Sequence, residues 1–226
     1  MSLNRFVLWV TTIIFGALFV TTVFAEQHQL ADVTLDRSLP NIKQGAEITM
    51  TTCLACHGLK YIKYRHLRKL GFTRAELDRL RAGKQMESSL VSLVKPEQMR
   101  AAFGIAPPDL SLITVARPQG SRYVYSLLTG YYQTSDGGTD NHVFPGVRMP
   151  DVLGYVSVSD PVEQTELQAK ANAVAVFLEW AADPHASERT RMGYFVMVYL
   201  IFLTILLYVI KSRVWQRINN FRLSRR

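Results

Sequence analysis

An uncharged run of 19 residues, from Met192 to Ile210, constrains this chain more than any other feature. As a helix, at about 1.5 Å per residue, it would be roughly 28 Å long, close to the thickness of the hydrocarbon core of a bilayer. Six basic residues and no acidic residue follow it, in 211–226. Because cytoplasmic flanks are rich in Lys and Arg, the pattern predicts one transmembrane helix over 192–210 and a basic cytoplasmic tail over 211–226.

A second apolar segment occupies residues 1–25. Its single charge is Arg5, and it closes with Val23-Phe24-Ala25, which has small residues at its first and third positions. A positive start, an apolar middle and such an ending are typical of a secretory signal peptide, although the length would also allow an uncleaved anchor. We expect cleavage after Ala25. Residues 26–191 would then be an exported domain, tethered by one helix to the periplasmic face of a bacterial inner membrane.

A net charge of +8 is typical of nucleic-acid-binding proteins, but the location of this charge argues against such a partner. Residues 26–191 carry 19 basic and 18 acidic residues, so the excess lies beside the two apolar segments. Charge in those places reports membrane topology. With 48% hydrophobic and 19% charged residues, the chain is neither disordered nor a multi-span membrane protein. Two cysteines exclude a disulfide-dense secreted scaffold.

The exported segment shows helix signals and few strand signals. The capping box of Thr73 and Glu76 predicts one helix start, and Asp160 followed by Pro161 predicts another. The expected helices cover 41–52, 73–81, 95–103, 121–132 and 160–182, and Asp183-Pro184 separates the last from the membrane helix. Residues 133–158, rich in Gly, Asp, Pro and Thr, should be mostly loop. The fold class expected is mainly α with long loops.

Residues 53–57 read Cys-Leu-Ala-Cys-His and contain both cysteines of the chain. The spacing C-x-x-C-H is the attachment signature of c-type haem. Two thiols on one helical turn can bond to the two vinyl groups of the porphyrin, and the imidazole that follows then lies under the iron. The motif predicts one covalently attached haem c, bonded to Cys53 and Cys56, with His57 as the proximal ligand.

Other chemistries also use paired cysteines. A thioredoxin-type disulfide usually follows a strand of a βαβ unit, and the sequence shows no such unit. A zinc site would need a second pair of ligands, and the chain has no further cysteine. Chance occurrence of the motif is the remaining alternative. Haem is favoured because both cysteines lie in the motif and the segment is expected to be exported, where c-type haem is attached.

The second axial ligand is less constrained by the sequence. Met149 lies in a Pro- and Gly-stiffened loop, and a Met/His pair would raise the reduction potential and suit electron transfer. His142 is the runner-up. The remaining histidines are His28, His66 and His185, and the methionines expected to fill the core instead are Met50, Met86 and Met99. An iron with two protein ligands points to an electron carrier, whereas a haem enzyme or sensor would have a five-coordinate iron that binds CO.

Several segments together resemble the cytochrome c1 family, the haem subunits of the cytochrome bc1 complex. They read CLACH at 53–57, APPDLS at 106–111, AR at 116–117, YVYSLLTGYY at 123–132, FPGVRMP at 144–150 and FLEWAADP at 177–184. CLACH alone is shared by every c-type cytochrome. The order of YVYSLLTGYY, FPG…MP and a C-terminal anchor is more specific. The resemblance implies a c-type cytochrome haem domain with one C-terminal transmembrane helix.

The resemblance also implies roles for single residues. His57 would be the proximal ligand and Met149 the distal one, and Arg117 would pair with a haem propionate. Tyr123 would lie beside the haem edge, and Pro108, with the proline before it, would pack against the ring. Without the resemblance, Arg117 could equally be a solvated loop charge, and Tyr123 and the prolines could be ordinary core residues.

The chain departs from the family in two places. The loop around Met149 is short, with Val147-Arg148 before the methionine and a single Pro150 after it, which leaves the geometry of this loop open. A further disulfide found in some members is impossible because both cysteines lie in the haem motif.

The implied partners are those of a respiratory complex. The chain would be an electron-transfer subunit and no enzyme by itself, taking electrons from the Rieske iron–sulfur protein beside cytochrome b and passing them to a c-type cytochrome. A membrane-anchored monohaem carrier outside a bc1 complex is the alternative. Residues 60–84 carry nine basic and two acidic residues, and 151–188 carry seven acidic and one basic. The acidic stretch could steer a basic acceptor, or both stretches could be solvated helix faces.

Overall fold

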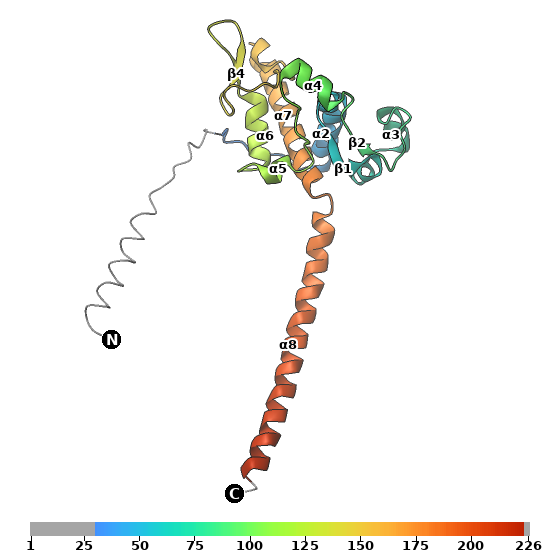
Figure 1. Ribbon diagram of the computed structural model, residues 1–226, viewed down its shortest axis with the longest axis vertical. Helices are drawn as coiled ribbons and strands as arrows, with labels where there is room; N and C mark the ends of the chain where they lie inside the picture. The colour runs from blue at the N-terminus through green and yellow to red at the C-terminus, as the bar shows by residue number, and fades with distance from the viewer. Residues whose placement is uncertain (1–29, 224–226) are drawn as a thin grey trace, which may run out of the picture.

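The structure, a computed structural model, describes residues 30–223. The signal peptide predicted at 1–25 lies outside the described residues. A helical domain is followed by one long helix that projects away from it (Figure 1). The α-helices are α2 (Leu39–Thr51), α3 (Arg74–Leu80), α4 (Pro96–Phe103), α5 (Ile113–Ala116), α6 (Ser121–Thr129), α7 (Pro161–Ala182) and α8 (Ala186–Leu223), and the 3₁₀ turns are η1 (Cys53–Ala55), η2 (Tyr64–Leu70) and η3 (Tyr155–Ser157). The mainly α prediction is confirmed.

The predicted helix starts follow their capping chemistry. Thr73 Oγ1 accepts from the Glu76 N–H at 3.3 Å, and the Glu76 carboxylate accepts from the Thr73 N–H at 2.6 Å, which completes the capping box of α3. The Asp160 carboxylate accepts from the Val162 N–H at 2.9 Å at the start of α7. Both starts are local signals, which is why they could be predicted.

Two short antiparallel ribbons interrupt the helices. Strand β1 (Leu59–Lys63) pairs with β2 (Ser89–Leu90), and β3 (Tyr131–Gln133) pairs with β4 (Thr139–Asn141). The prediction that the helix over 121–132 extends to residue 132 is therefore wrong, because α6 ends at Thr129 and Gly130 follows it. The aromatic residues after this glycine gain a strand partner, with Tyr131 opposite Asn141. The expected loop at 133–158 likewise contains β4 and η3.

Helices α2 and α7 cross closely at the centre of the domain. An added Cβ at Gly45 would overlap the backbone carbonyl of Ala173 and would come within 2.9 Å of the Phe177 Cβ. Glycine is therefore required at this crossing. Helix α6 packs on α7 as well, so α7 is the shared support of the fold.

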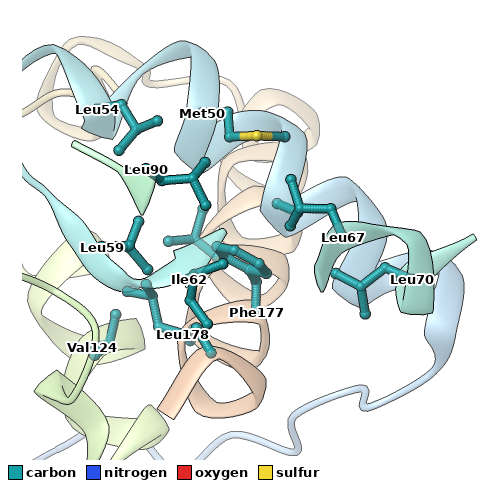
Figure 2. Close-up of a cluster of buried hydrophobic side chains, with 14 of the residues drawn as sticks. Met50, Leu54, Leu59, Ile62, Leu67, Leu70, Leu90, Val124, Phe177 and Leu178 are labelled. Carbon is teal, nitrogen blue, oxygen red and sulfur yellow. The ribbon is translucent and has the colours of Figure 1, made fainter. Parts of the chain in front are cut away.

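The hydrophobic core gathers around Phe177, which is fully buried (Figure 2). Side chains from the first half of the chain surround it, from α2, β1, η2 and β2: Met50, Leu59, Ile62, Leu67 and Leu90. Burial of each large aliphatic side chain contributes roughly 1.5–3 kcal/mol to folding. The core therefore fixes α2 and the turn that follows it against α7.

Helix α8 carries the predicted membrane segment. It is the one helix of the described chain that is long and apolar enough to cross a membrane, and its most apolar stretch has a mean hydropathy of 2.4 with no residue buried. The helix begins six residues before the uncharged run and continues through the basic residues to Leu223. The basic tail is thus an extension of the same helix over its described length.

Candidate haem site

The Cys53–His57 segment forms a tight turn directly after α2. The N–H groups of Cys56 and His57 both donate to the Cys53 carbonyl, at 3.1 and 2.8 Å. Leu54 is buried in the core with 4% exposure, and its carbonyl accepts from the Leu93 N–H at 2.9 Å. Both cysteines are free and partly exposed. The turn is therefore anchored through Leu54, while both cysteine residues keep some exposed surface.

The protonation state of Cys53 argues against a nucleophilic cysteine. Burial raises the pKa of this thiol to about 11, the neighbouring Cys56 adds to the increase, and a hydrogen bond with Thr49 acts in the opposite direction. The sulfur is consequently a thiol rather than a thiolate at neutral pH. Because the thiolate is the reactive nucleophile, this environment does not suit cysteine-based hydrolysis.

The imidazole of His57 is oriented by the segment 106–111. Its Nδ1 lies 2.8 Å from the Pro108 carbonyl oxygen, so Nδ1 donates the proton and Nε2 carries the lone pair. Burial lowers the pKa of His57, with the Pro108 carbonyl and the Asp109 carboxylate acting in the opposite direction. A neutral imidazole with one nitrogen held by a carbonyl is the arrangement used for metal ligation.

Asp109 holds segment 106–111 beside the turn, a role that was not predicted from the sequence. Its Oδ2 accepts from the Lys60 N–H at 2.9 Å, and its Oδ1 accepts from the Ser111 N–H at 3.0 Å. The Leu110 N–H donates to the Gly58 carbonyl at 2.7 Å nearby. The hydrogen bond from the Ser111 N–H to Asp109 closes an Asx-type turn. An Asp two residues before a Ser could have indicated this turn from the sequence.

Met149 lies half-buried in the loop 144–150, which we call the Met149 loop, and packs against the hydrophobic core. Its carbonyl accepts a hydrogen bond from the Tyr131 phenol at 2.9 Å. Its neighbour Arg148 donates to the carbonyl of Phe103, at the end of α4, at 3.2 Å. The loop is therefore tied to α4 and to β3, although no strand or helix runs through it.

The structure brings Arg117 and Tyr123 together. The guanidinium of Arg117, just after α5, lies 5.4 Å from the centre of the Tyr123 ring, in the first turn of α6. Within residues 30–223, no hydrogen bond, ion pair or ring contact links either side chain to His57 or Met149. Their roles at a haem edge and a propionate therefore stay predictions, as does packing of the exposed Pro108 ring on the porphyrin.

The alternative ligands have other partners. The His142 ring stacks on Tyr132, with centroids 4.2 Å apart, and the rings of His66 and His185 meet edge to face at 6.2 Å. Met50 and Met99 are buried, and Met86 packs against the core, as expected for core residues. His28 lies outside the described residues.

The donor set restricts which metal group the site could hold. Residues 30–223 contain no cluster of three or more His, Cys, Asp and Glu side chains that could bind a metal ion directly. A porphyrin supplies four nitrogen ligands itself, so it needs only one imidazole, one thioether and two thiols for attachment. The neutral His57, the half-buried Met149 and the two free thiols fit this requirement.

Comparison with known proteins places the chain in a family. The family model described as "Cytochrome C1 family" matches residues 33–94 and 80–218, which is most of the chain. The chain belongs to the cytochrome c1 family. It is therefore a membrane-anchored electron carrier of a haem c family.

Individual relatives can be aligned with this chain over most of their length. The chain is similar to cytochrome c1 of Rhodospirillum rubrum, with 30% identity over 80% of this chain and 83% of the relative. It is 29% identical to cytochrome c1 of Allochromatium vinosum, over 86% of this chain and 91% of the relative. A relative from Nitrosomonas europaea named "Ammonia monooxygenase gamma subunit" is 24% identical, over 89% of this chain and 94% of the relative.

Proposed function

We propose that this member of the cytochrome c1 family carries one haem c, attached through Cys53 and Cys56, with His57 and Met149 as axial ligands. The observation that carries the proposal is the hydrogen bond from His57 Nδ1 to the Pro108 carbonyl, next to two free thiols on the same turn. Because Nδ1 carries the proton of this bond, Nε2 keeps the lone pair that a metal would need. The bound haem would supply a one-electron couple whose potential is raised by the methionine ligand.

Other residues of the chain would orient His57 or contact the haem. The Pro108 carbonyl holds the tautomer of His57, and Asp109 keeps Pro108 in place through the backbone of Lys60 and Ser111. Arg117, with its five fixed donors, would pair with a propionate, and Tyr123 beneath it would hold the guanidinium near the haem edge. Pro108 would exclude water from one side of the ring.

We further propose that the haem domain lies on the periplasmic side of the inner membrane and the C-terminus in the cytoplasm. The basic residues of 211–226 support this orientation through the positive-inside rule. The partners would be cytochrome b and the Rieske iron–sulfur protein, and a c-type cytochrome would accept the electron. Within such a quinol–cytochrome c oxidoreductase this subunit relays electrons and makes no substrate bond.

The surface that would meet the acceptor is smaller than the charge count suggested. Five of the acidic residues in 151–188 already have partners within the chain. Asp151 and Asp160 accept hydrogen bonds from backbone N–H groups. Ion pairs with basic side chains occupy the other three: Glu179, Asp183 and Glu188. Glu163 and Glu166 remain exposed at the start of α7. We therefore expect added salt to slow electron transfer to a basic acceptor only modestly, and a rate independent of salt would remove this surface from the proposal.

Purification of the full-length chain from its native membrane tests the proposal. We expect the polypeptide mass to include one porphyrin, and the reduced spectrum to show a six-coordinate c-type band that only high concentrations of CO change. The same sample should also show the absorption bands of b-type haem, and the Rieske protein should co-purify with the chain. A polypeptide without added porphyrin mass, or with both thiols free to react with an alkylating reagent, would contradict the proposal.

A second candidate is a monohaem carrier of the same architecture outside a bc1 complex. The similarity to a protein named as a gamma subunit of ammonia monooxygenase favours it, because that name belongs to a different assembly. The same purification separates the two candidates. Co-purification of cytochrome b and the Rieske protein supports the first, and a haem-bearing chain that purifies without them supports the second.

A further inference from the structure

We propose that Tyr131 is a positioning residue for Met149, because its phenol fastens the backbone of the Met149 loop where the thioether must reach the iron. The inference rests on the proposed function, since it takes Met149 as an axial ligand. The hydrogen bond from the Tyr131 phenol to the Met149 carbonyl, at 2.9 Å, is its starting point.

The Met149 loop needs such a support because it has little structure of its own. Gly146 has a φ of +73°, and one turn hydrogen bond joins the Val147 N–H to the Phe144 carbonyl at 3.2 Å. Contacts from elsewhere then fix its course. Gly146 N–H donates to the Asp140 carboxylate at 2.7 Å, Arg148 reaches the Phe103 carbonyl, and Tyr131 binds Met149 itself. The contact at Met149 lies on the residue that carries the thioether.

Tyr131 is itself fixed by burial and by strand pairing, so its hydroxyl can fix the position of the Met149 loop. It is the first residue of β3 and has 5% exposure. Its strand partner is Asn141, which has no exposed surface. The Asn141 amide donates to the Leu127 carbonyl of α6 at 2.7 Å, and its oxygen accepts from the Val143 and Phe144 N–H groups at 2.9 and 3.2 Å. Helix α6, the β3–β4 ribbon and the entry of the loop therefore form one hydrogen-bonded unit.

The phenol is a dependable donor in this unit. Its hydroxyl carries the one donor hydrogen of the side chain, and the Met149 carbonyl accepts it at 2.9 Å. A thioether is a weak ligand that must be presented within about 0.5 Å of its working position, which loops achieve through supporting hydrogen bonds. Loss of the phenol would let the Met149 backbone move away from the iron.

The experiment compares Tyr131→Phe with Tyr132→Phe in the full-length, haem-loaded chain. Tyr132 is the matched control, because it neighbours Tyr131 on β3 but its hydroxyl lies 3.5 Å from Asp140 and makes no contact with Met149. For Tyr131→Phe we expect a weaker sulfur-to-iron charge-transfer band in the oxidised spectrum and a lower midpoint potential. We also expect CO to bind the reduced protein about tenfold more tightly, which corresponds to one hydrogen bond of ordinary strength. Tyr132→Phe should leave all of these unchanged.

Two further variants keep the inference and the proposed function apart. Met149→Leu should abolish the charge-transfer band, and if it does not, the ligand assignment itself is wrong. If Met149→Leu abolishes the band while Tyr131→Phe matches the wild type in band, potential and CO affinity, the ligand stands and the positioning role is overturned. Arg148→Gln, at an exposed residue, should shift CO affinity in the same direction by a smaller factor, and an effect larger than that of Tyr131→Phe would also contradict the inference.

Discussion

The Cys53–His57 turn and the Met149 loop would each supply one ligand of the proposed haem, but they are held in place in different ways. The turn takes its shape from hydrogen bonds between residues three and four positions apart. The Met149 loop is held by residues six, 18 and 45 positions away, at Asp140, Tyr131 and Phe103. Attachment of a cofactor can thus be encoded in five consecutive residues, whereas the second ligand depends on the whole fold around it.

The largest effect should come from removing the thiols of the turn. In the double variant Cys53→Ser/Cys56→Ser, we expect complete loss of covalently bound haem, because no other cysteine exists to form a thioether. The measurement is haem staining of the denatured polypeptide, with Met149→Leu as the control that should retain full staining. Haem that stays with the denatured double variant would show that attachment does not use this turn.

The support beneath the turn can be broken separately at Gly45. We expect Gly45→Ala to lower the free energy of unfolding by about 3 kcal/mol, because the new methyl group overlaps the Ala173 carbonyl where α2 crosses α7. Denaturant titration of the haem-loaded chain measures the loss. Gly193→Ala, on α8 where nothing lies within 4 Å of an added Cβ, is the matched control. Equal stability of the two variants would mean that the α2–α7 crossing is not closely packed.

The support of the Met149 loop can be broken at Asn141. We expect Asn141→Ala to lower the free energy of unfolding by about 2 kcal/mol, because the buried carbonyl and N–H groups that it serves lose their partner. The folded Asn141→Ala protein should also show a weakened sulfur-to-iron charge-transfer band, which the Gly45→Ala protein should not. Asn172→Ala removes comparable hydrogen bonds to residues 34 and 36, and should reduce stability with no spectral change.

The smallest effect concerns pH and lies away from both ligands. Lys43, followed by Thr73, lowers the pKa of Glu76 to about 2, so its carboxylate stabilises the fold above pH 4.5. This contribution is lost as the pH falls from about 4.5 to about 2, where the folded state also takes up the proton. We expect the melting temperature of Glu76→Gln to lie below that of the wild type at neutral pH, and the difference to close across this window. Glu97→Gln, at an exposed residue of α4, should show no such convergence.

Features that depend on near neighbours could be predicted from the sequence. The capping box of α3, the start of α7 at Pro161 and the long apolar helix each follow from one continuous stretch of sequence. The boundaries were less accurate where a tertiary partner intervened. Tyr131 fitted the helical pattern of α6, yet pairing with Asn141 drew it into a strand.

The sequence by itself determined the membrane helix, the turn with its two thiols and imidazole, and the family to which they belong. These features are local, since capping and the C-x-x-C-H spacing act within about one helical turn and hydropathy acts along one continuous stretch of about 20 residues. Only the tertiary structure decided that Pro108 orients His57, that Asp109 holds Pro108, and that Tyr131 holds Met149. Each of those contacts joins segments far apart in the chain, so each exists only after α2, α6 and α7 have packed and brought the segments together.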